Sequence, residues 1–143
     1  MKFIGINGSP RKNMNTAKLM KSALDGIESC GLKTKLYNLY DLNYKGCYSC
    51  FACKRENSGS YGRCVINDDL KPIFEEIDTA DGLLVGSPVY YGDVTGQMRA
   101  FLERLMFQYM LYTKPPKTLR KKRLKIGLIY TMNIDETLLN KVL

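Results

Sequence analysis

The stretch KFIGINGSPRKNMNTAKLM, residues 2–20, decides the fold class of this 143-residue chain. Lys2–Asn7 is a largely apolar run that stops at Gly8-Ser9-Pro10, which is typical of a buried strand followed by a turn. Thr16–Ser29 then repeats apolar residues at helical spacing, with Asn15 expected as its N-cap and Gly31 as its end. The chain therefore opens with a strand, a turn and a helix.

The same alternation of strand and helix continues along the chain. We expect further strands at Lys33–Leu39, Gly82–Gly86 and Leu124–Tyr130, the last of them buried, with Ser87–Thr95 as a loop. We expect further helices at Leu70–Ile77, at Gly96–Tyr109 and from Asp135 onward. This order predicts an α/β fold, with a parallel sheet between two layers of helices. We expect one domain over residues 1–143, with a cysteine-rich insertion at about residues 44–66.

Composition narrows the class of protein. The chain is 45% hydrophobic and 25% charged, which is ordinary for a soluble globular domain. No apolar run is long enough to cross a bilayer, so we expect a cytoplasmic protein without membrane contact. Histidine is absent from the sequence, which excludes imidazole bases and histidine metal ligands.

The net charge of +8 is concentrated in Thr113–Lys125. A basic run of this kind can bind nucleic acid. The alternative is a solvated loop, which we favour because no aromatic residues are interleaved for base stacking. We therefore expect no nucleic-acid partner.

Four of the five cysteines cluster in the sequence. Cys47, Cys50 and Cys53 follow one another at three-residue spacing and Cys64 comes later, whereas Cys30 stands alone and is expected to be a small core residue. A C-x2-C-x2-C run is typical of iron–sulfur ligation. Two alternatives remain open, a redox-sensitive thiol loop and structural zinc. Zinc sites usually present two separated C-x2-C pairs, which this spacing matches poorly.

Two loops carry polar or aromatic residues where strands end. The first loop, residues 8–16, is rich in side chains that can donate hydrogen bonds to a phosphate. It precedes a helix whose N-terminal amides attract anions, although an ordinary turn and cap would look similar. In the second loop, Gly86–Gly96, Pro88 stiffens the chain, Tyr90 and Tyr91 can flank a flat ring, and Gly92 lets backbone amides approach that ring. The alternative is that the tyrosines cover the sheet edge. Ligands of open α/β sheets bind at such carboxyl ends of strands.

Together, Gly8-Ser9-Pro10-Arg11 with Asn15-Thr16 and the segment Gly86–Gly96 resemble the two FMN loops of the flavodoxin-like NADPH-dependent FMN reductases. With the cysteine run, the chain resembles the iron–sulfur flavoprotein branch of that family. The resemblance implies a flavodoxin-like, doubly wound sheet of strand order 2-1-3-4-5, with FMN at its carboxyl edge.

By position, the resemblance also implies a set of site residues. The phosphate would be held by Ser9, Arg11, Asn13, Asn15 and Thr16. The isoalloxazine ring would be lined by Pro88, Val89, Tyr90, Tyr91, Gly92 and Asp93, with a weaker contact from Thr131, Met132 and Asn133. A [4Fe–4S] cluster would be ligated by Cys47, Cys50, Cys53 and Cys64, although Lys54–Arg63 makes the last gap longer than the family's.

The implied activity is an FMN-dependent oxidoreductase that passes electrons from NAD(P)H or a ferredoxin-like donor, through FMN and the cluster, to a small acceptor. The implied assembly is a homodimer or homotetramer. The alternatives are an FMN or quinone reductase without a cluster, and a flavodoxin-style carrier. The fold's fifth strand and last helix are not found before Leu143, so we expect a longer natural protein or a second chain over the edge of the fourth strand.

Overall fold

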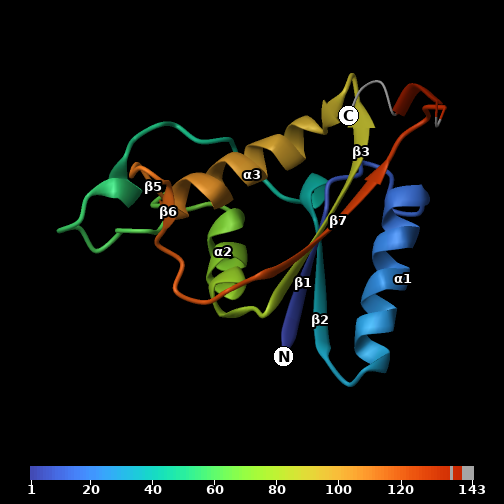
Figure 1. Ribbon diagram of the computed structural model, residues 1–143, viewed down its shortest axis with the longest axis horizontal. Coiled ribbons are helices and arrows are strands. Elements are labelled where there is room, and N and C mark those ends of the chain that lie inside the picture. The colour runs from blue at the N-terminus through green and yellow to red at the C-terminus, as the bar shows by residue number, and fades with distance from the viewer. Residues whose placement is uncertain (136, 140–143) are drawn as a thin grey trace.

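The computed structural model describes residues 1–135 and 137–139. Its central sheet consists of β1 (Lys2–Asn7), β2 (Lys33–Asn38), β3 (Gly82–Tyr90) and β7 (Lys125–Thr131), which are all parallel and in the order β2-β1-β3-β7. Helix α1 (Asn15–Ser29) covers one face, and α2 (Leu70–Thr79) and α3 (Gly96–Tyr109) cover the other (Figure 1). The flavodoxin-like strand order and the three layers predicted from the sequence are confirmed.

The remaining elements are short. They are the 3-10 turns η1 (Leu39–Asp41) and η2 (Ala52–Lys54), and the strands β4 (Asp93–Val94), β5 (Met110–Leu111) and β6 (Lys117–Thr118). Residues 137–139 are helical, and the rest of the helix expected from Asp135 onward lies outside the described residues. Among the helices of the described part of the chain, none is long and apolar enough to cross a membrane.

The expectation that Ser87–Thr95 is a loop is wrong for most of its length. Strand β3 continues to Tyr90 because β7 stays paired with it as far as Pro88↔Thr131 and β4 pairs with its last two residues. The chain then turns at Tyr91 and Gly92, both with positive φ, and returns as β4 antiparallel to β3. The second predicted loop is thus a hairpin that projects from the carboxyl edge of the sheet.

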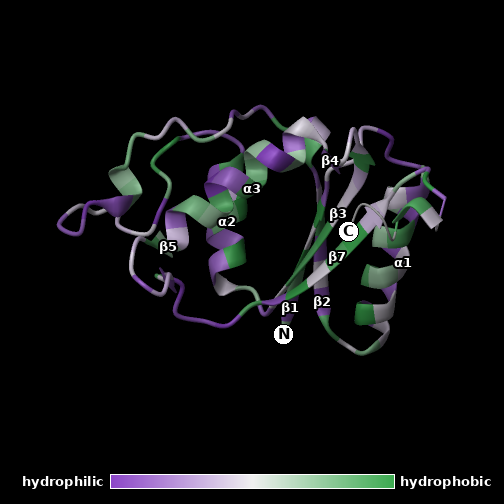
Figure 2. Cartoon of the chain, turned by 45° about the horizontal axis from the view of Figure 1, so that its top comes forward, coloured by the Kyte–Doolittle hydropathy of each residue, from purple (hydrophilic) through white to green (hydrophobic). Residues whose placement is uncertain are grey.

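The main core lies between the sheet and helices α2 and α3. Ile4, Ile6, Leu83 and Val85 point toward these helices and are almost completely buried. The residues expected to face inward from α2 are all buried: Leu70, Ile73, Phe74 and Ile77. Figure 2 shows the apolar colour continuing along β3 and β7. Burial of this apolar face fixes the register of the sheet and therefore the positions of the loops at its carboxyl edge.

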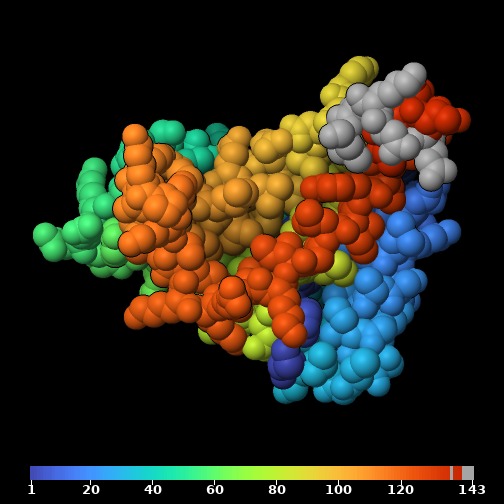
Figure 3. All heavy atoms as spheres, viewed as in Figure 1, coloured from blue at the N-terminus to red at the C-terminus, as the bar shows by residue number. Residues whose placement is uncertain are grey.

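Strand β7 is not buried as expected. Ile126 and Leu128 share the core-facing side of the sheet with Leu83 and Val85, yet they are 62% and 59% exposed. Within the described residues β7 pairs only with β3, and no helix next to α3 covers it, so it lies on the outside of the molecule (Figure 3). An open strand edge of this kind can pair with further chain.

The basic segment after α3 is only partly a solvated loop. Lys117–Thr118 forms a two-stranded ladder with Met110–Leu111. Arg120 donates from Nη2 to the carbonyl oxygens of Ile77 and Ala80, at 3.0 and 3.1 Å. Because these carbonyls belong to the C-terminal end of α2, the guanidinium caps that helix.

Candidate functional site

A cavity of about 460 Å³ opens where β1, β3 and β7 end. It is lined by Ser9, Arg11, Met14, Asn15, Thr16, Pro88, Val89, Tyr90, Thr131, Met132 and Asn133. These residues come together because parallel strands end at the same edge of a sheet, and the crevice outside those ends is the usual ligand site of such folds. Both predicted loops and the predicted third contact after β7 therefore share one cavity.

Four residues of the predicted flavin set lie outside that lining, namely Asn13, Tyr91, Gly92 and Asp93. Tyr91 and Gly92 form the tip of the hairpin, where the Tyr91 side chain is fully exposed. Asp93 accepts two hydrogen bonds of 2.5 Å from Nη2 of Arg99, and this contact lowers the pKa of its carboxyl. The tip therefore stands beside the cavity in this conformation.

One end of the cavity is formed by the N-terminus of α1. Met14, not Asn15, occupies the N-cap position, so the expectation that Asn15 caps the helix is wrong. Among the described residues, no side chain accepts a hydrogen bond from this first turn. Free first-turn amides and the positive end of the helix dipole attract an anion.

Polar side chains surround this helix end. Ser9 is 4% exposed, and its Oγ accepts a hydrogen bond of 3.2 Å from the Arg11 amide. The hydroxyls of Thr16 and Thr131 are 2.6 Å apart, which joins α1 to the end of β7. Neutral hydroxyls, free amides and an arginine are the donor set that a phosphate ester requires, so the residues present fit the phosphate of FMN.

Thr95 joins the two loops, a role that sequence analysis missed. Its hydroxyl donates to the Gly8 carbonyl at 2.8 Å and accepts from the Met98 amide at 3.3 Å, which caps α3. Its own amide donates to Ser87 Oγ at 3.1 Å. A threonine immediately before a helix that begins at Gly96 is a common N-cap signal, which would have pointed to the cap of α3.

A second, much smaller cavity lies beside the C-terminal half of α3. All four clustered cysteines line it, together with Tyr48, Phe51, Val65, Ile66, Arg104, Phe107 and Gln108. Its volume is about 20 Å³, close to that of one water site. Cys30 is instead exposed at the end of α1, so its expected place in the core is wrong.

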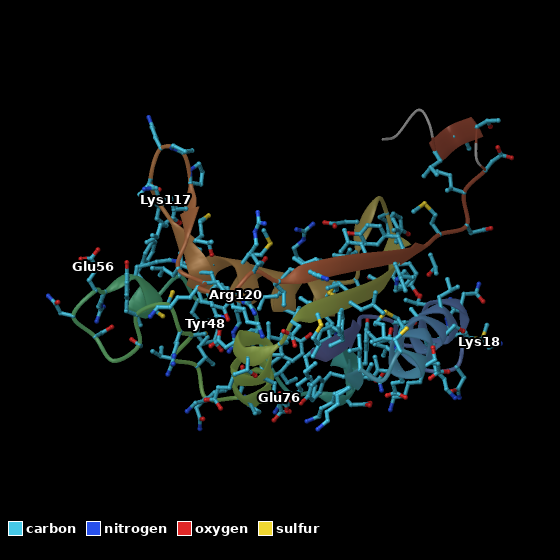
Figure 4. The ribbon with its side chains drawn as sticks, turned by 60° about the horizontal axis from the view of Figure 1, so that its bottom comes forward. Lys18, Tyr48, Glu56, Glu76, Lys117 and Arg120 are labelled. Atoms are coloured by element: carbon cyan, nitrogen blue, oxygen red, sulfur yellow. The ribbon has the colours of Figure 1, made fainter. Side chains whose placement is uncertain are left out.

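The cysteines share a cavity without converging on one point. Cys53 is buried, which raises the pKa of its thiol, whereas Cys50 is exposed. Within residues 1–135 and 137–139, no three or more Cys, Asp or Glu side chains are placed to hold a metal ion. The segment that carries Cys47–Cys53 is irregular, with Glu56 near its outer end and Tyr48 closer to the helices (Figure 4).

Two buried side chains of α3 have unused hydrogen-bond donors in this cavity. Arg104 and Gln108 are 1% and 3% exposed, and Nε of Arg104 and Nε2 of Gln108 have no partner among the described atoms. Gln108 also accepts a hydrogen bond of 3.0 Å from the Cys64 amide. Unsatisfied buried donors next to thiols fit an added group with sulfur acceptors, as an iron–sulfur cluster provides.

Helix α3 runs from the end of β3 toward β5 (Figure 1), and the two cavities lie near its opposite ends. Thr95, at the start of the helix, bonds to the loops of the first cavity, and Arg104 and Gln108 line the second. At a rise of 1.5 Å per residue, this spacing corresponds to about 14–20 Å along the helix axis.

A doubly wound parallel sheet, with hydrogen-bond donors suited to a phosphate at the carboxyl ends of its central strands, defines a flavodoxin-like α/β protein. The chain belongs to the NADPH-dependent FMN reductase family, whose model matches residues 1–129.

Individual relatives agree with this assignment. The chain is 40% identical over 104 residues to an iron-sulfur flavoprotein of Methanocaldococcus jannaschii, a match that covers 73% of this chain and 51% of the relative. It is 36% identical over 104 residues to an iron-sulfur flavoprotein of Methanosarcina thermophila, with 73% and 52% coverage. The chain thus spans about half the length of these curated relatives.

Among solved structures, the NAD(P)H:quinone oxidoreductase from Methanothermobacter marburgensis has a similar fold. The TM-score is 0.78 at 19% identity, and the match covers 99% of this chain and 71% of that one. At this identity the similarity concerns the fold alone.

Proposed function

We propose that this chain is the FMN-binding part of an FMN-dependent oxidoreductase that also carries a [4Fe–4S] cluster. Electrons would come from NAD(P)H or a ferredoxin-like donor and leave to a small acceptor. The observation that carries the FMN assignment is the 460 Å³ cavity, in which both predicted loops and the end of β7 meet at an uncapped helix N-terminus. The names of the relatives support the cluster.

The residues of the cavity divide between the two ends of FMN. The first-turn amides of α1, the Ser9 and Thr16 hydroxyls and the Arg11 guanidinium would bind the phosphate. Pro88, Val89 and Tyr90 would lie along the ring, and the hairpin tip at Tyr91 and Gly92 would contribute backbone donors. Bound FMN supplies hydride and single-electron chemistry, while the protein binds and orients it.

Cys47, Cys50, Cys53 and Cys64 would be the ligands of the cluster. The cavity they line is smaller than a cluster, so the irregular segment before Cys53 would have to move outward to admit it. Because the two cavities are separated along α3, a flavin in one subunit would exchange electrons best with a cluster in another subunit. We therefore propose a homodimer or homotetramer as the working assembly.

Two measurements test this function. The first is an FMN titration of the flavin-free protein followed by flavin fluorescence, in which we expect saturation at one FMN per chain. The second is anaerobic oxidation of NADH and NADPH with a quinone or free flavin as acceptor. Binding without turnover would favour a flavodoxin-style carrier, and turnover without iron would favour a reductase without a cluster. Absence of saturable FMN binding would contradict the proposal.

A further inference from the structure

We propose that Gln108 and Arg104 donate hydrogen bonds to sulfur atoms of the metal-bound cysteine site and so set its reduction potential and its metal affinity. This inference rests on the proposed function, because it assigns donors to the site that Cys47, Cys50, Cys53 and Cys64 would form. It makes Gln108 and Arg104 positioning residues that act through the cysteine site.

The geometry starts from α3. Positions 104 and 108 are one helical turn apart and lie on the same face, on the margin of the apolar stripe formed by Phe101 and Leu105. Both side chains line the cysteine cavity. A helix that buries an arginine and a glutamine in this way must provide partners for all their polar atoms, since a buried donor without a partner loses its hydrogen bonds to water.

Arg104 has partners for every donor group except one. Its Nη1 and Nη2 bind the two carboxylate oxygens of Asp68 at 2.5 and 3.0 Å, and Nη1 also donates to the Lys45 carbonyl at 3.1 Å. The guanidinium lies over the Phe74 ring, 5.5 Å from its centre. These contacts fix the guanidinium plane and leave Nε, which has no partner among the described atoms.

Gln108 likewise has a partner for one polar atom of its side chain and none for the other in the described part of the chain. Its Oε1 accepts from the Cys64 amide at 3.0 Å, which fixes the orientation of the side-chain amide and leaves Nε2 without a partner among the described residues. The cysteine sulfurs supply acceptors in the cavity that the two unpaired donors share. Hydrogen bonds to sulfur stabilise the more negative, reduced form of a cluster, and such outer contacts also strengthen metal binding.

The test compares the wild type with Gln108→Leu and with Gln97→Leu, a matched change at an exposed glutamine of the same helix. Each protein is reconstituted anaerobically with iron and sulfide. The reduction potential is measured by titration followed by electron paramagnetic resonance. Hydrogen bonds to sulfur are detected by the shift of the Fe–S stretching bands when H₂O is replaced by D₂O. A merely structural role of Gln108 would not change that shift.

We expect Gln108→Leu to have a lower potential than the wild type and a smaller deuterium shift, and Gln97→Leu to match the wild type. If Gln108→Leu is unfolded by circular dichroism, Gln108→Met, which keeps an unbranched side chain of similar length, takes its place. A wild-type potential together with a full deuterium shift in the Gln108 variant would overturn the inference.

Failure of the proposed cluster can be told apart from failure of this inference. If the wild type assembles no cluster, the cluster assignment fails. The same proteins are then titrated with Co²⁺, whose thiolate absorption bands report binding. Affinity about tenfold weaker in Gln108→Leu than in the wild type and Gln97→Leu would support the donor role. Equal Co²⁺ affinity in all three proteins, or no binding to any of them, would overturn it.

Discussion

The two cavities of this protein are built in different ways. The cavity proposed for the flavin, called the flavin cavity below, lies across the ends of β1, β3 and β7 and the N-terminus of α1. Thr95 joins two loops there that are far apart in sequence, and its amide is held by Ser87. The cysteine cavity has one rigid wall, α3, and one irregular wall that includes Cys47–Cys53. The first cavity is preorganised by the sheet, whereas the second would need its metal to bring the thiolates together.

The largest effect is expected from breaking the cysteine cavity alone. Cys53→Ser removes its buried thiol and should reduce iron from about four atoms per chain to less than one, because a serine hydroxyl is a poor ligand for iron–sulfur clusters. FMN content should not change, since the other cavity is built independently. The measurement is iron and flavin per chain, with exposed Cys30→Ser as the control. Equal iron in both variants would contradict the assignment.

Arg11→Ala should have the opposite effect to Cys53→Ser, because it changes the flavin cavity and leaves the cysteine cavity intact. Loss of a charged phosphate contact should weaken FMN binding by about 1.5–3 kcal/mol, which is roughly a 10- to 150-fold rise in Kd. Iron content should stay at the wild-type value. The control is Lys18→Ala, which removes an equal charge from the exposed surface of α1 outside the cavity (Figure 4). An unchanged Kd for Arg11→Ala would remove Arg11 from the phosphate site.

Thr95→Ala tests how firmly the sheet organises the flavin cavity. It removes the cap of α3 and the bond to the Gly8 carbonyl, so the free energy of unfolding should fall by about 1–2 kcal/mol. Chemical denaturation measures this loss, and Thr95→Ser, which keeps the hydroxyl, should recover most of it. If Thr95→Ser is as unstable as Thr95→Ala, the hydroxyl is not what joins the loops.

The smallest effect is expected at Glu76, which is not part of the lining of either cavity. Its carboxylate accepts from Lys2, Lys35 and Tyr37 at 2.6–2.7 Å, and these contacts lower its pKa from 4.5 to about 2. A lowered pKa adds stability that is complete above pH 4.5 and is lost as the pH falls toward 2.

Glu76→Gln should therefore be less stable than the wild type by about 1 kcal/mol at neutral pH, a modest value because solvent screens these ion pairs. The difference should shrink between pH 4.5 and 2, and FMN and iron content should not change. Denaturation curves across this pH range measure it. A difference that stays constant with pH would show that the carboxylate charge is not responsible.

The difference between the cavities also explains how much the sequence could predict. The strands, the helices and the placement of loop residues at one edge of the sheet follow local rules, because strands and helices alternate along the chain. The strand order and the individual residues expected to contact FMN came from the family resemblance. Thr95 has a local signal for the cap of α3, but no local signal indicates its contact with Gly8, 87 positions away in the sequence. The apolar composition of β7 predicts a buried strand, but composition does not report which neighbours cover it.

For the cysteine cavity, the sequence predicts only the four cysteines proposed as ligands. The spacing of Cys47, Cys50 and Cys53 indicates the chemistry, but it gives no information about what lies behind them. In the sequence, Arg104 and Gln108 are indistinguishable from ordinary polar residues of a helix. Their burial depends on contacts with Asp68 and Cys64, which are distant in sequence. Their one local signal is that polar residues lie against an apolar stripe.

The most direct test of the central claim is the cofactor content of anaerobically purified protein, measured as FMN, iron and acid-labile sulfide per chain together with the absorption spectrum. The account predicts one FMN with about four irons and four sulfides, and flavin alone in Cys53→Ser. Flavin without iron in the wild type would contradict the cluster half of the account. Protein that neither contains nor binds flavin would contradict the assignment of the cavity at the ends of β1, β3 and β7.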